Sequence, residues 1–169
     1  MTRPVFVSYA SADRTEAEAI RDAVERRGIP CWMTPRDVPP GAVFGDAIVD
    51  AIEAAKVMLL VFSQAANNSD AIKKELMLAG QAEIDVIPLM IENIAPSGHF
   101  RYELATRQWI NLFSAWDAEM ERLVAHLTTL VGPAAKPSEP AVAVADQPPT
   151  AVVPPVPPAP APPGGSAGP

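Results

Sequence analysis

Two runs of six residues constrain the fold of this chain more than any other feature. Residues 57–62 (VMLLVF) and 86–91 (VIPLMI) are apolar throughout and lack the polar–apolar alternation of a strand with one wet face. Unbroken apolar strands are typical of parallel sheets that are covered by helices on both faces. Segments with helical periodicity lie between such runs, so the sequence predicts an α/β fold built on a parallel sheet.

The expected elements alternate along the first 131 residues. Strands are predicted at 5–8, 30–33, 57–62, 86–91 and 109–113, and helices at 15–27, 43–55, 70–81 and 116–131. Pro88 argues against a fully hydrogen-bonded strand around it. Apolar stripes on two helices are predicted to face the core: Phe44, Ala47, Ile48, Ala51, Ile52 and Ala55 on one, and Trp116, Met120, Leu123, Leu127 and Leu130 on the other.

Proline divides the chain into two parts. Of its 20 prolines, 13 lie in residues 132–169, a segment with three charged residues and no aromatic one. We therefore expect one folded domain over 1–131 and a disordered Pro/Ala-rich tail over 132–169. Extended polyproline geometry makes a semi-rigid spacer the favoured role of the tail, and a ligand for a proline-binding module the alternative.

Charge and cysteine content exclude several classes of function. Residues 1–131 carry 12 basic and 18 acidic side chains, a balance that repels nucleic acid and anionic lipid. No apolar run approaches the roughly 20 residues of a membrane helix, and the first residues lack a long apolar leader, so a cytoplasmic protein is expected. Cys31 has no disulfide partner, and the spacing of His99 and His126 is not that of a zinc site, so no structural metal is expected.

Strand-to-helix loops meet at the carboxyl edge of such a sheet, where ligands usually bind. The first loop, 8–13, has no glycine, so a dinucleotide fingerprint or P-loop is absent. Ser63 and Ser114 occupy the places where a phosphoacceptor receiver carries its Asp and Lys. No Gly-x-Ser-x-Gly elbow is present, and Cys31 lies in an apolar strand without a nearby histidine, which argues against hydrolase nucleophiles.

Four motifs in order resemble those of Toll/interleukin-1 receptor (TIR) domains, in their bacterial form. Residues 5–13 (VFVSYASAD) resemble the first-strand motif, 31–41 (CWMTPRDVPPG) the BB loop, 67–76 (NNSDAIKKEL) the third-helix segment and 85–89 (DVIPL) the fourth strand. The likeness covers about residues 3–131. It implies a flavodoxin-like TIR fold, with a five-stranded parallel sheet of order 2-1-3-4-5 flanked by helices. Members of the family act as self-associating adaptors or as enzymes that cleave NAD+ at the nicotinamide–ribose bond.

The resemblance makes Glu75 the candidate catalytic residue. On a helix, Ile72, Leu76 and Ala79 share one stripe and Glu75 falls roughly 40° outside it, at the boundary of the core. A carboxylate beneath the ribose would stabilise the positive charge that builds up as the bond breaks. The structural alternative is an ordinary boundary glutamate. Many enzymatic members carry a Trp four residues earlier, where this chain has Ala71.

Further candidates lie in the first two loops. The substrate-binding candidates are Ser8, Tyr9, Ser11, Trp32, Arg36 and Phe44, and the interface candidates are Arg36, Asp37, Val38, Pro39, Pro40 and Gly41. Trp32 is equally a candidate core residue, and Phe44 also fits the buried stripe of its helix. Asp13 is expected to cap the following helix, and His99 to be exposed to solvent.

Three functions stay open at this point. The first is an NAD+ hydrolase of signalling, defence or effector type that is activated by self-assembly and gives ADP-ribose or a cyclic product, with NAD+ as substrate and no cofactor. The second is a non-catalytic adaptor that binds itself or other TIR domains through 36–41. The third is a receptor for a nucleotide-like signal. Nucleic acid and membrane are not expected partners, and delivery into a host cell is one possible setting.

Overall fold

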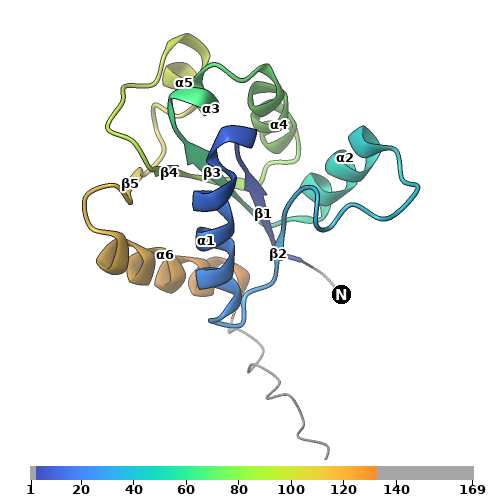
Figure 1. Cartoon of the computed structure of the whole chain (residues 1–169), viewed down its shortest axis with the longest axis horizontal. Helices are drawn as coiled ribbons and strands as arrows, with labels where there is room; N and C mark the ends of the chain where they lie inside the picture. Colours follow the sequence, from blue (N-terminus) through green and yellow to red (C-terminus); the bar gives the residue numbers. More distant parts are fainter. Residues whose placement is uncertain (1–2, 133–169) are drawn as a thin grey trace, which may run out of the picture. The chain divides into compact units, whose positions relative to one another are not determined.

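A single parallel sheet forms the centre of the computed structural model, which describes residues 3–132. Its strands are β1 (Val5–Ser8), β2 (Cys31–Trp32), β3 (Val57–Phe62), β4 (Asp85–Met90) and β5 (Ile110–Asn111). All pairings are parallel and the order is β2-β1-β3-β4-β5, which confirms the predicted fold (Figure 1). The outer strands β2 and β5 are two residues long, shorter than the sequence predicts.

Helices cover both faces of the sheet. They are α1 (Arg14–Glu25), α2 (Phe44–Ala54), α3 (Gln64–Asn67), α4 (Asp70–Gln81), α5 (Gly98–Glu103) and α6 (Trp116–Val131), with a 3-10 turn, η1 (Ser11–Asp13), before α1. Side chains of α1 and α6 pack on one face, against Val5, Val7 and Leu59. Side chains of α2, α4 and α5 pack on the other, against Phe6, Met58 and Leu60. The alternation of β1 residues between the two cores decides which side chains can approach α4.

Helix α4 is formed as the sequence predicts. The Ser69 hydroxyl accepts a hydrogen bond of 3.3 Å from the Ile72 amide, which satisfies one free donor at the start of the helix. The buried residues of α4 are Ile72, Leu76 and Ala79, the expected stripe. This packing holds the second turn of α4 beside the end of β1.

Helix α2 differs from the prediction. Phe44 is 53% exposed and not part of an inward stripe, and within the helix Ile52 alone is fully buried. Ala47, Ile48 and Ala51 are half-buried. The reason is the length of β2, whose two residues extend the sheet too little to lie beneath the first turn of α2.

Backbone alternation in β4 explains how Pro88 is accommodated. The Asp85 amide donates to the Lys56 carbonyl, just before β3, and the Ile91 amide donates to the Phe62 carbonyl at the end of β3. The Met90 carbonyl accepts from the Phe113 amide on the β5 side. Alternation therefore places the backbone groups of Val86 and Pro88 on the β5 side as well. Pro88 thus removes no hydrogen bond from the β3–β4 pair. Since β5 pairs with Leu89 and Met90, the outer edge of β4 at Val86 has no strand beside it in the described residues.

The expected tail, 132–169, lies almost wholly outside the described residues. Within residues 3–132, no helix combines the length and apolar character needed to cross a bilayer.

Candidate functional site

The centre of the candidate site is a contact between β1 and α4. The Ser8 hydroxyl, 1% exposed at the last residue of β1, donates a hydrogen bond of 2.5 Å to Oε2 of Glu75. Glu75 is half-buried and lies beside the inward stripe of α4. The carboxyl group thus points toward the carboxyl edge of the sheet and not into bulk water.

Burial dominates the electrostatics of this carboxyl. Desolvation raises the pKa of Glu75 to about 7, although the hydrogen bond from Ser8 acts in the opposite direction. The side chain therefore changes its charge near neutral pH. A carboxylate held in a poorly solvated place interacts strongly with a positive charge that develops next to it.

An aromatic pair lies on the same face of the sheet. The rings of Trp32 and Phe6 stack with centroids 5.1 Å apart and an angle of 13° between their planes. Phe6 and Ser8 are two residues apart on β1, so their side chains leave the same face. Trp32 is half-buried in this stack and serves both as a core residue and as a candidate wall of the site. Ala71 is exposed on the first turn of α4.

Three other substrate-binding candidates do not join this group. Tyr9 packs against the core on the α1 and α6 face, and its hydroxyl donates a hydrogen bond of 2.7 Å to the Thr34 carbonyl. Ser11 is exposed at the start of η1 and makes no cap. Phe44 lies exposed at the start of α2. The structure therefore brings Ser8 and Glu75 together, with Trp32 on the same side of the sheet, and leaves Tyr9 on the other side.

Arg36 is held by ion pairs. Its guanidinium donates to both carboxylate oxygens of Glu25, at 2.8 and 2.9 Å, and to the Cys31 carbonyl at 2.7 Å. It also pairs with Asp37, whose side chain is 4% exposed and which pairs with Arg3 as well. Burial opposes ionisation of Glu25, but hydrogen bonds from Arg36 and from the Cys31 amide hold the pKa of Glu25 below its usual value.

This network separates the interface candidates into two groups. Arg36 and Asp37 fasten the loop to α1 and β2, whereas Pro39, Pro40 and Gly41 are exposed and Val38 is half-buried. The outer group is free to meet another molecule. The Glu25 partner could not be predicted from the sequence, because nothing in the spacing of residues 25 and 36 specifies that contact.

Asp13 does not cap α1 as predicted. Its side chain makes no capping hydrogen bond; it accepts one from the buried Ser63 hydroxyl, which in turn accepts from the Ala66 amide at 3.0 Å. Burial raises the pKa of Asp13, against the hydrogen bond from Ser63. The buried Asp13–Ser63 pair therefore ties the first loop to the start of α3.

His99 and Cys31 are both withdrawn from solvent. His99 is half-buried and not exposed as predicted, because its ring packs edge-on against Phe100, with centroids 5.9 Å apart; within residues 3–132 its buried Nε2 has no hydrogen-bond partner. Cys31 is fully buried, and burial raises the pKa of its thiol far above the usual range. A thiol that stays protonated is a poor nucleophile.

Known proteins resemble this chain over most of its described residues. The sequence model of the TIR domain matches residues 5–124. The stimulator of interferon genes protein of Magallana gigas is 43% identical over 75 residues, which is 44% of this chain and 18% of that relative. The chain thus matches less than a fifth of the length of this curated relative.

Solved structures agree on the fold. The TIR domain of the Toll-related receptor TRR-2 from Hydra magnipapillata has a TM-score of 0.59 at 22% identity, over 76% of this chain and 96% of that one. A metazoan TIR-STING receptor from C. gigas, in complex with 2',3'-cGAMP, has a TM-score of 0.55 at 29% identity, over 72% of this chain and 39% of that one. The RPS4 and RRS1 TIR domain heterodimer has a TM-score of 0.53 at 15% identity, over 75% and 96%.

The matched region includes all five strands and the helix that carries Glu75. Sequence match, strand order and structural likeness agree over the same part of the chain. This chain belongs to the TIR domain family.

Proposed function

We propose that this TIR domain hydrolyses NAD+ at the nicotinamide–ribose bond, with Glu75 as the catalytic carboxylate. The observation that supports the proposal is the poorly solvated Glu75 carboxyl, which accepts the Ser8 hydrogen bond at the carboxyl edge of a parallel sheet. Ligands of such sheets bind at this edge. A buried carboxyl with a pKa near 7 at this position is typical of a functional group more than of a structural one.

The chemistry requires one carboxylate. As the C1'–N1 bond breaks, its electron pair moves to the pyridinium nitrogen, nicotinamide leaves as a neutral molecule and the ribose gains positive charge. The ionised Glu75 stabilises this charge, which grows toward the transition state. Water then adds to C1' and releases one proton, which gives ADP-ribose. If a ring nitrogen of the adenine adds in place of water, the product is cyclic.

Ser8 and Trp32 have supporting roles in this proposal. Ser8 is too buried to reach a ribose while it donates to Glu75, so it acts as a positioning residue that orients the carboxyl group. Trp32 offers the aromatic surface on the same side of the sheet, and the absent ring at Ala71 makes this contribution more important. We regard Tyr9, Ser11 and Arg36 as less suited to contact the substrate from their observed positions.

Assembly is part of the proposal. TIR domains associate with other TIR domains, as in the RPS4 and RRS1 heterodimer. The exposed loop residues 39–41 and the exposed Phe44 would lie at such an interface and shape the site of a neighbouring copy. We therefore propose that activity rises with protein concentration, and that the protein acts in the cytoplasm.

The direct test is incubation of concentrated protein with NAD+, followed by chromatography of nicotinamide. We expect turnover by the wild type and by Glu53→Gln, a control at an exposed helical glutamate, and none by Glu75→Ala. Equal absence of nicotinamide with all three proteins at concentrations where the chain is oligomeric would overturn the proposal.

A non-catalytic adaptor is the second candidate, and two observations favour it. Ala71 removes the ring expected beside the catalytic glutamate, and the loop at 38–43 is mostly exposed. In that case capture of another TIR domain would depend on Pro39, Pro40 and Phe44 and would be unaffected by Glu75→Gln.

A further inference from the structure

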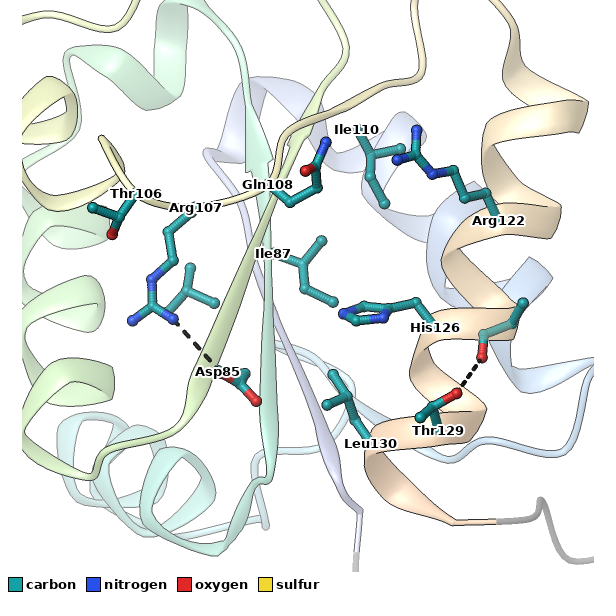
Figure 2. A pocket seen from close by; sticks show the side chains of 12 residues that line it. Asp85, Ile87, Thr106, Arg107, Gln108, Ile110, Arg122, His126, Thr129 and Leu130 are labelled. Carbon is teal, nitrogen blue, oxygen red and sulfur yellow. Dashed lines mark hydrogen bonds and ion pairs between the residues drawn. The ribbon is translucent and has the colours of Figure 1, made fainter.

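A cavity of about 710 Å³ opens at the amino end of β4, and neither Ser8 nor Glu75 lines it (Figure 2). Its walls are the first residues of β4, the segment 106–110 and the last turns of α6. It exists because β5 pairs with the last two residues of β4 and leaves the earlier ones without a neighbour. Its volume lies in the usual range for small-molecule sites.

Three of the four ionisable side chains that line this cavity are basic. Arg107, Arg122 and His126 line it, and Asp85 is the one acidic residue among its lining residues. Figure 2 shows the His126 ring directed toward Ile87 and Arg122 extended toward Ile110. The chain as a whole has a net charge of -7, so this local excess of positive charge does not follow from a basic composition.

The two guanidinium groups are weakly engaged. Arg107 lies 3.6 Å from Asp85, and Arg122 lies 3.7 Å from Glu119. Both distances are near the limit for an ion pair, and such exposed pairs contribute little. Within residues 3–132, neither guanidinium donates a hydrogen bond. Their planar sets of donors therefore stay available for an oxyanion.

Neutral groups complete the lining. The Val86 amide faces the outer edge of β4, which has no strand beside it in the described residues. The Gln108 amide and the Thr106 hydroxyl lie on the segment 106–110. Ile87 supplies apolar surface between Arg107 and His126, and Leu130 adds apolar surface below His126 (Figure 2). Donors around an apolar floor suit a ligand that has both an anionic group and an apolar body.

We propose that this cavity binds a small organic anion, a phosphate monoester of nucleotide size, at a site separate from Glu75. The anionic group contacts Arg122, the apolar body lies on Ile87 and Leu130, and Arg107, on the other side of β4, adds positive charge nearby. The inference does not depend on the proposed NAD+ hydrolysis, because no residue is shared between the two places.

The test uses the full chain, labelled with nitrogen-15, and AMP as the probe. We expect AMP to shift the NMR signals of the Val86 amide and the His126 ring. Arg122→Gln should weaken binding about tenfold, since it removes a charged hydrogen-bond donor, and Arg107→Gln should weaken it less. Arg101→Gln, at an exposed arginine on α5 outside the cavity, is the matched control and should leave the affinity unchanged.

Two further probes distinguish the contribution of the phosphate group of AMP from that of its nucleoside part. Inorganic pyrophosphate should shift the same signals with lower affinity, and adenosine should not shift them. Glu75→Gln should bind AMP as the wild type does, so failure of the proposed function would not affect this result. The proposal is wrong if AMP at millimolar concentration leaves Val86 and His126 unshifted, if adenosine binds as well as AMP, or if Arg101→Gln weakens binding as much as Arg122→Gln.

Discussion

Ser8 and Glu75, 67 positions apart in the sequence, share a hydrogen bond of 2.5 Å that joins the end of β1 to the second turn of α4. The bond favours the ionised carboxylate, whereas burial disfavours it, and burial is the larger effect. With the pKa near 7, the charge of Glu75 responds to small changes of pH around neutrality.

Ser8→Ala should raise the pKa of Glu75 further above its usual range. The lost hydrogen bond is worth about 1 kcal/mol, so the shift should be about one pH unit. Carbon-13 NMR of the Glu75 carboxyl, followed against pH, measures this directly whether or not the protein is an enzyme. Ser114→Ala, which alters an exposed serine, should leave the titration unchanged. A midpoint that is the same in Ser8→Ala and in the wild type would show that the hydrogen bond does not act on the carboxyl.

Glu75→Gln should stabilise the protein at alkaline pH. The carboxyl has a pKa of about 7 in the folded chain, above its ordinary value of 4.5, so the folded state binds more protons between these values and stability falls as pH rises from 4.5 to 7. The loss is at most about 3 kcal/mol above pH 7, and the glutamine variant avoids it. Urea unfolding at pH 4.5 and at pH 8.5 measures the difference between the two proteins. If Glu75→Gln raised the unfolding free energy as much at pH 4.5 as at pH 8.5, the stabilisation could not come from removal of the ionised carboxylate.

Nicotinamide release by the wild type should increase with pH and level off above neutrality, with a midpoint near 7, because the ionised carboxylate is the active form. Initial rates between pH 5.5 and pH 8.5 would show this rise. Glu75→Gln should reduce the rate at pH 8 by about 100-fold or more, since one electrostatic group is removed from the transition state. A rate that falls over the same pH range would mean that a protonated group is required.

Arg36→Gln should weaken the attachment of the loop and not the affinity for substrate. The arginine is partly exposed, so solvent screening limits the expected loss in unfolding free energy to about 1 kcal/mol at pH 7. The pKa values of Glu25 and Asp37 are lowered, so their contribution is present above the unfolded pKa values and is lost as the pH falls through the folded ones. The difference between variant and wild type should therefore shrink below about pH 4. The control is Arg26→Gln, which changes the arginine that follows Glu25 at the end of α1.

The sequence determines much of the central sheet and of α4. Residues 57–62 carry no polar side chain because both faces of β3 are covered, so their burial is visible in the residue types alone. The cap at Ser69 and the stripe of Ile72, Leu76 and Ala79 mark α4 in the same way.

Contacts between distant parts of the chain could not be predicted so well. Periodicity shows that Phe44 and Ile52 share one side of a helix, but not that the short β2 leaves the first turn of α2 uncovered. The motif at 5–13 directs attention to Ser8, yet the geometry that makes it the partner of Glu75 depends on how α4 packs on β1. The same holds for Arg36, whose position beside Glu25 follows from the path of the loop.

Pro88 has a consequence for how copies of this domain can meet. An incoming strand would need amide donors along the outer side of β4, and proline denies it one at the middle of the strand. Pro88 therefore disfavours pairing of strands from different molecules at the outer edge of β4. Such pairing would build continuous sheets and lead to insoluble fibres. Association with another TIR domain, as in the RPS4 and RRS1 heterodimer, would then depend on side-chain contacts and could be reversible.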